Sequence, residues 1–222
     1  MKHKMIRLFL VFALVSPLWA QTLETRVGNQ IWAGVNLDVA RFRNGDVIPE
    51  AKTKEAWLRA AAKKQPAWCY YENKTDNGRH FGKLYNWYAV NDPRGLAPEG
   101  WHIASEEEWE ELFRHLAGKS IAGLALKTRE GWLQDGNGTD VVGFHAMPGG
   151  NRFEDGHFEG INEYTGWWTT TEADETNAYD INLTDRSHSI SSYQISKEDG
   201  LYVRCVKNTT AGQSIIASGS RQ

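Results

Sequence analysis

Proline and cysteine are scarce in this chain of 222 residues, which has 6 Pro and 2 Cys. So little proline, together with a charged fraction of 24%, argues against a mostly disordered protein, and glycine follows no period that would indicate a fibre. A hydrophobic content of 41% is enough to bury a core, in one domain or two small ones. The abundant residues are 10 Trp and 21 Gly. Because indoles carry a large apolar surface and glycines permit tight turns, we expect a compact, turn-rich fold packed around tryptophan.

Residues 1–20 differ in composition from the rest of the chain. The basic residues Lys2, Lys4 and Arg7 lie at the start of this segment, an apolar run follows, and the segment ends at Ala20. This order is typical of a secretory signal peptide, and the run is too short for a stable membrane span. A retained N-terminal anchor is the alternative. We therefore predict an exported protein of the periplasm, cell surface or extracellular space, with no membrane span after signal removal.

Acidic residues outnumber basic ones once that segment is gone. Without residues 1–20 the chain has 22 basic and 28 acidic residues, a net charge of −6. A mildly acidic exported protein is a poor candidate for nonspecific nucleic-acid binding, because such binding depends on basic side chains. We expect no nucleic-acid partner.

The two cysteines, Cys69 and Cys205, lie in a chain that we expect to be exported. An even number of cysteines in an oxidising compartment favours one disulfide. Closing so long a loop would stabilise the fold by roughly 4 to 5 kcal/mol in the chain-entropy model. The alternative is a pair of buried free thiols.

Periodicity predicts one domain over residues 31–208, between an N-terminal segment of residues 21–30 and a disordered, polar tail of residues 209–222. Helices are expected where capping residues precede a helical apolar pattern, with Thr53 and Ser105 as the N-caps. Short antiparallel strands are expected where turn signals recur about every ten residues. The expected strands are residues 30–39, 166–171, 179–183, 189–195 and 201–207, and the expected helices are residues 53–64 and 106–117.

No motif in the sequence carries catalysis. HExxH, GxSxG and phosphate-binding loops are absent. His102 lies six residues before Glu108 and could be drawn as a metal or acid/base pair, but a structural histidine hydrogen-bonded near the start of the helix is favoured, because no second ligand accompanies it. Asp135, Asn137 and Asp140 are candidate calcium ligands, yet they lack the closing Glu of an EF-hand, so we favour an Asx-rich turn and expect no cofactor.

The aromatic residues are the remaining candidates for a binding site. Trp167, Trp168, Tyr85 and Trp87 could present rings to a sugar or anchor a protein, with burial as the alternative. Strand alternation would direct the rings of Trp167 and Trp168 to opposite faces, so we expect one ring in the core and the other exposed.

A set of short motifs in a fixed order resembles the Fibrobacter succinogenes major paralogous domain, a family of exported bacterial domains. The resemblance covers residues 31–208 and implies a compact α+β fold akin to C-type lectin-like domains and to the formylglycine-generating enzyme superfamily, with two or so helices on short twisted antiparallel strands. It implies no particular activity. The motifs are residues 82–90, 98–102, 108–109, 126–127, 131–132, 139–140, 143–144, 147–150, 166–171 and 203–206.

The sequence also departs from these relatives. Ala97 stands where many members of the family have Cys, and Tyr202 where a small Ser is common. The Glu-Pro-Asn, Gln-Pro-Asp and Trp-Asn-Asp triplets of calcium-dependent lectins are absent. Cys69 and Cys205 are far apart in sequence, unlike the nearby cysteines that hold copper in formylglycine-generating enzymes. Both of those activities are therefore disfavoured.

Two functional hypotheses follow. The first is an exported, noncatalytic binding or interaction domain of the bacterial cell envelope, with an envelope protein or a glycan as its partner. The second is an exported metal-dependent enzyme related to the formylglycine-generating superfamily. The enzyme would need two or more residues of one set to meet in a single pocket. That set is Cys69, His102, Glu108, Asp140 and His145.

Overall fold

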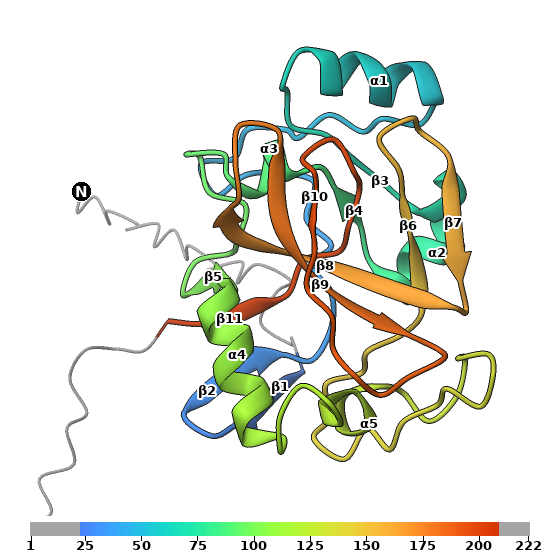
Figure 1. Cartoon of the computed structure of the whole chain (residues 1–222). Helices are drawn as coiled ribbons and strands as arrows, with labels where there is room; N and C mark the ends of the chain where they lie inside the picture. The colour runs from blue at the N-terminus through green and yellow to red at the C-terminus, as the bar shows by residue number, and fades with distance from the viewer. Residues whose placement is uncertain (1–22, 209–222) are drawn as a thin grey trace, which may run out of the picture.

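The computed structural model describes residues 23–208, and the expected signal peptide and tail lie outside the described residues. Helices and short strands share the chain, which confirms the predicted compact α+β fold (Figure 1). The closer likeness to C-type lectin-like domains stays a prediction. The helices are α1 (Lys54–Ala62), α2 (Thr75–Phe81), α3 (Trp87–Val90), α4 (Glu106–His115) and α5 (Ala122–Leu126). The strands are β1 (Glu24–Val27), β2 (Gln30–Ala33), β3 (Trp68–Cys69), β4 (Leu84–Tyr85), β5 (Trp101–Ile103), β6 (Gly149–Arg152), β7 (Phe158–Ile161), β8 (Tyr164–Glu172), β9 (Asn177–Thr184), β10 (Gln194–Ser196) and β11 (Cys205–Lys207).

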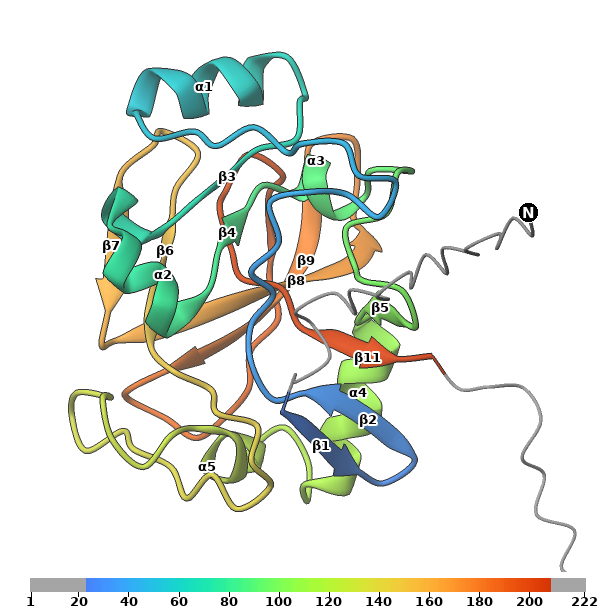
Figure 2. The same cartoon turned by 180° about the vertical axis from the view of Figure 1, so that it is seen from behind.

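The strands form four small antiparallel sheets. One has the order β1-β2-β11-β5, a second has the order β10-β9-β8, and β3-β4 and β6-β7 are two-stranded. Helix α4 covers one face of the four-stranded sheet, since it lies in front of the sheet in Figure 1 and behind it in Figure 2. Within residues 23–208, none of the helices has the length and apolar character needed to cross a membrane.

Helix α4 begins where its sequence predicts. The Ser105 side chain accepts a hydrogen bond from the Glu108 backbone N–H, and the Glu108 side chain bonds back to the Ser105 backbone, which completes a capping box. Such a cap stabilises a helix by about 1 kcal/mol. The buried face packs Trp109 against Trp32 of β2, with ring centroids 4.6 Å apart. At the other end Gly118, at φ +96°, donates its N–H to the Phe113 carbonyl and stops the helix.

The edge of the four-stranded sheet differs from the prediction. Residues 24–27, expected to lie in a separate N-terminal segment, pair with β2 as β1. Strand β2 ends at Ala33 rather than at residue 39. Beyond it Asn36 turns inward, where its amide donates to the Phe81 carbonyl and its carbonyl oxygen accepts from Trp167 and Arg204. These side-chain bonds hold the segment in an irregular conformation.

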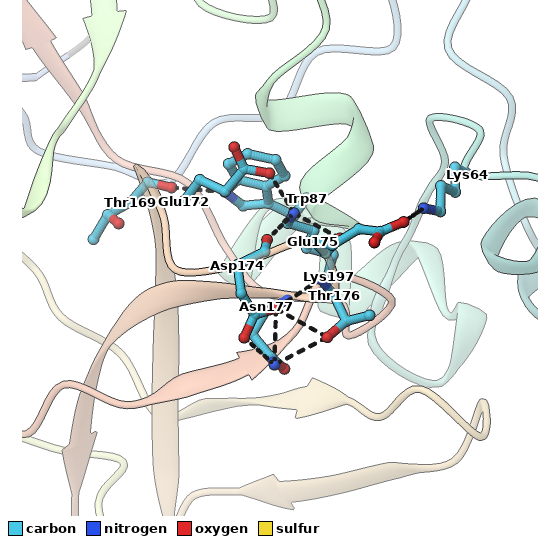
Figure 3. A network of polar contacts seen from close by, with 9 residues as sticks. All are labelled: Lys64, Trp87, Thr169, Glu172, Asp174, Glu175, Thr176, Asn177 and Lys197. Carbon is cyan, nitrogen blue, oxygen red and sulfur yellow. Dashed lines mark hydrogen bonds and ion pairs between the residues drawn. The ribbon is translucent and has the colours of Figure 1, made fainter.

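Buried lysines and arginines connect the loops of the domain. Each has a side chain within 5 Å of the centre of an aromatic ring, and each donates to at least one backbone carbonyl. In Figure 3 the Lys197 ammonium lies beside the Trp87 ring and donates to Glu172 and to the carbonyls of Asp174 and Glu175. The five residues are Lys83, Lys127, Arg152, Lys197 and Arg204.

Arg204 makes the densest set of these contacts. Its guanidinium donates to the carbonyls of Ala33, Phe144 and His145 and to the Asn36 side chain, and it lies 4.3 Å from the centre of the Phe144 ring. Burial lowers the pKa of Arg204 to about 9. A fully buried cation is therefore held in place by carbonyl oxygens rather than by a carboxylate.

The predicted disulfide is not formed, because Cys69 and Cys205 are both free, buried thiols. Cys69 lies in β3 and packs in one hydrophobic cluster with Trp57 and Tyr71, whereas Cys205 lies in β11 and packs in a second cluster. Burial raises the pKa of Cys69 to about 11 and that of Cys205 to about 12. Both thiols are thus protonated and inaccessible in the folded chain.

Removal of the Arg204 side chain should destabilise the fold. In Arg204→Met the three carbonyls lose their donor, so we expect the free energy of unfolding in urea to fall by about 3 kcal/mol or more. Arg186, whose side chain is 82% exposed, provides the control. Arg186→Met should change stability by less than about 0.5 kcal/mol. Equal losses in the two variants would contradict the role assigned to Arg204.

Alkylation distinguishes free thiols from a bridge. Treated with iodoacetamide under native conditions, the protein should gain no mass, because both thiols are buried and protonated. In denaturant without a reductant it should gain two carbamidomethyl groups by mass spectrometry. No gain in denaturant would show that the cysteines are bridged.

Candidate functional site

An open groove of about 440 Å³ lies between the end of α2 and three loops. This volume is within the range of roughly 300 to 1,000 Å³ that is usual for ligand sites. The lining residues are His80, Phe81, Thr128, Glu130, Gly131, Met147, Pro148 and Asn162.

Helix α2 supplies one wall of the groove. His80 and Phe81 are the last residues of the helix before its cap, and the centres of their rings lie 5.7 Å apart. Gly82, at φ +81°, then turns the chain away from the groove, a conformation that favours glycine. The Phe81 carbonyl accepts a hydrogen bond of 2.8 Å from the Asn36 amide. This wall is therefore tied to the interior of the domain.

Backbone hydrogen bonds hold the opposite wall. The Thr128 N–H donates to the Ala146 carbonyl at 3.0 Å, which joins the two loops on either side of the groove floor. The Asn162 N–H donates to the Pro148 carbonyl at 2.9 Å, and Asn162 itself adopts a φ of +68°. Because these bonds are internal to the domain, the groove has its shape before any ligand binds.

The groove combines an apolar floor with polar groups at its rim. The apolar lining residues are the least exposed, since Pro148 is buried and Phe81 and Met147 are half-buried. His80, Glu130 and Asn162 are exposed and can donate or accept hydrogen bonds. The Thr128 hydroxyl already donates to backbone carbonyls, which leaves it poorly placed as a nucleophile. The arrangement suits noncovalent binding.

The sequence alone did not reveal this groove. Met147 and Pro148 belong to one of the motifs that resemble the family, but they were not expected to bind a ligand, and His80 and Phe81 had no predicted role. The lining residues come from four separate segments of the chain, and no short motif connects them. The groove depends on tertiary contacts, such as the hydrogen bond from Asn162 to Pro148, which a sequence pattern does not predict. Only the folded chain brings these residues together.

The four aromatic residues proposed as ligand contacts are all buried, with side chains 0 to 3% exposed. The expectation that either Trp167 or Trp168 faces solvent is wrong, because β8 has a hydrophobic cluster on each face. The polar atom of each of these four side chains also forms a hydrogen bond inside the domain. Trp167 donates to Asn36, Trp168 to the Tyr85 carbonyl and Trp87 to the Thr169 carbonyl, while the Tyr85 hydroxyl donates to the Val39 carbonyl.

Two of the three candidate calcium ligands use their oxygens to cap the backbone. The Asn137 side chain accepts from the Trp132 N–H, and one Asp140 oxygen accepts from the His145 N–H while the other pairs with the His145 ring at 2.5 Å. Asp135 is exposed, with a φ of +57°. Among residues 23–208, no group of three or more His, Cys, Asp or Glu side chains is arranged to hold a metal ion.

The side chains of His102 and Glu108 form a hydrogen-bonded pair at the start of α4. The His102 ring is 2.5 Å from Glu108 through Nε2 and 2.7 Å from the Asn208 side chain through Nδ1. The hydrogen bond to Glu108 is the main reason that the pKa of His102 is raised. Burial alone would raise the pKa of Glu108, but its bonds with His102 and Ser105 outweigh burial and lower that pKa. The histidine is thus bonded near the helix start, as predicted.

The residues that the enzyme hypothesis requires fall into two pairs and one isolated thiol. His102 pairs with Glu108, and His145 pairs with Asp140. Cys69 belongs to neither pair, since it is fully buried in the core. Enzymatic activity stays an untested prediction.

The His102–Glu108 pair should make stability depend on pH. Since the folded chain raises the pKa of His102 above its usual 6.5, this stabilisation is fully present below pH 6.5 and is lost as the pH rises through the folded pKa. The His102 side chain is 41% exposed, so screening keeps the effect below about 1 kcal/mol. The free energy of unfolding between about pH 6 and 9 should fall less steeply in His102→Gln than in the wild type. Parallel pH profiles would contradict this assignment.

Comparison with known proteins identifies one family. A model of the Fibrobacter succinogenes major domain matches residues 25–207. Neither the curated proteins nor the solved structures give a match. The matched region extends from within β1 to the end of β11 and contains the groove, the buried cations and both cysteines. The chain therefore belongs to the Fibrobacter succinogenes major domain family.

Proposed function

We propose that this protein is a noncatalytic binding or interaction domain, exported to the bacterial cell envelope, and that the groove between α2 and the loops around Met147 and Asn162 is its ligand site. The ligand is an envelope protein or a glycan. The observation that carries the proposal is the groove itself, which combines an apolar floor and a polar rim on walls fixed by internal hydrogen bonds.

The chemistry of the lining supports binding in two ways. Phe81 and Met147 offer apolar contact area, and a methionine side chain adapts its shape to the group that it meets. Glu130 and Asn162 at the rim can orient a ligand through hydrogen bonds. The signal-peptide pattern of residues 1–20 supports export. None of these features requires a reaction at the site.

Variants of the groove test this proposal. The purified protein is screened on a glycan array and against isolated envelope proteins, and any ligand found is titrated by calorimetry. Met147→Glu places a charge on the apolar floor, and Glu130→Lys reverses a charge at the rim. Met147→Glu should weaken binding about tenfold or more, as expected for a central contact of an interface. Glu130→Lys should weaken binding by a smaller factor, about two- to fivefold, as expected for an exposed charge.

Val47 gives a matched control, because it is 59% exposed and does not line the groove. Val47→Glu should leave the affinity within about twofold of the wild type, which is the usual range for a residue outside the site. The proposal fails if no ligand is found, or if the ligand binds equally well to both groove variants. Thermal unfolding of each variant shows whether a loss of binding reflects a loss of folding.

A further inference from the structure

The segment around α1 has the opposite charge to the rest of the chain. Residues 50–66 contain five basic and two acidic residues, whereas the remainder of the chain contains 20 basic and 26 acidic residues. The helix stands at one end of the molecule, at the top of Figures 1 and 2, away from α4 and α5. The segment therefore carries a net charge of +3 in a chain that is acidic elsewhere.

Helix α1 is fastened to the domain on one side only. Trp57 is 1% exposed, and its indole N–H donates to the Glu198 carbonyl at 2.9 Å. Buried Arg152 donates to the carbonyls of Ala51 and Thr53, just before the helix begins. These contacts fix the position of the helix without using its basic side chains.

A cleft of about 190 Å³ separates another part of α1 from the extended segments that precede and follow it. Its apolar lining includes Pro49, Ala56, Ala60 and Pro66. The charged residues that line it are Arg59, Lys63 and Glu50, and the Glu50 carboxylate is paired with Lys52. The cleft is smaller than the roughly 300 Å³ or more of a site that encloses a whole small ligand. It has room for one side chain of a larger partner.

The needs of the helix explain only some of the basic residues in this segment. A helix dipole favours cations at the C-terminal end, which accounts for Arg59. It disfavours cations at the N-terminal end, where Lys52 and Lys54 lie. Lys52 pairs with Glu50 and Lys64 with Glu175. Arg59 and Lys63, which line the cleft, form no ion pair with any other residue in the range 23–208.

We propose that the cleft beside α1 binds an extended acidic segment of a protein partner. One apolar side chain of that segment fills the cleft, and neighbouring carboxylates pair with Arg59 and Lys63. A peptide is favoured over a sugar because none of the lining residues in the described part of the chain has an aromatic ring to stack against a sugar. This surface is distinct from the groove at Met147 and binds whether or not that groove does.

A labelled pentapeptide, with a central leucine between two pairs of glutamates, provides the probe. Fluorescence anisotropy at low salt should detect its binding to the full chain. Arg59→Ala and Lys63→Ala should each weaken binding about two- to fivefold, as for single ion pairs at a surface. A peptide with serine in place of leucine should bind more weakly, and high salt should reduce binding by screening the charges.

Arg114 provides the matched control, because it is an exposed arginine in the last turn of α4. Arg114→Ala should leave the peptide affinity unchanged. Met147→Glu should also leave it unchanged, which would show that this surface binds independently of the groove. The proposal is overturned if the wild type does not bind the peptide, or if Arg114→Ala weakens binding as much as Arg59→Ala. Tighter binding of an oligouronate than of the peptide would also overturn it.

Discussion

Backbone carbonyls that are buried in loops need hydrogen-bond donors, and this domain provides them with buried lysine and arginine side chains. Its strands are short, so sheets alone leave many carbonyls without a partner. An arginine has five N–H groups and a lysine has three, which lets one side chain satisfy several carbonyls at once. The aromatic rings beside these cations offset part of the cost of removing charge from water. The high tryptophan content and the buried cations are therefore linked, because the aromatic rings stabilise the cations that donate to the carbonyls.

The same contacts hold the groove and the cleft that we propose as binding surfaces. Lys127 directly precedes Thr128, which lines the groove, and it donates to the carbonyls of Gly136, Thr184 and Ser187. Arg152 fixes the chain just before α1 and so sets the position of the cleft. Loops that are held from inside lose little conformational freedom when a ligand binds, which favours affinity. Buried charge in this fold therefore serves to shape the surface.

Much of the local structure could be predicted from the sequence. The capping box at Ser105 and Glu108, and the N-cap at Thr53, gave the starts of α4 and α1 because capping depends on residues three positions apart. Strands β8 and β9 were also anticipated, although each extends beyond its predicted range at both ends. The groove and the buried cations were not, since Lys127 and Arg204 look like ordinary surface residues until distant loops surround them. Likewise, the even number of cysteines gave no information about which strands would carry them.

Strand β8 separates the two hydrophobic clusters, with Trp167 on one face and Trp168 on the other. In a strand with one wet face, a slip of one residue is opposed by the hydrophobic pattern alone. Here both faces are dry, yet a slip of one residue would still place Gly166 or Thr169 where one of the two indoles now packs. Each indole N–H would also lose its acceptor, an Asn36 side-chain oxygen on one face and the Tyr85 carbonyl on the other. Side-chain volume and two hydrogen bonds together thus select the alignment of this strand.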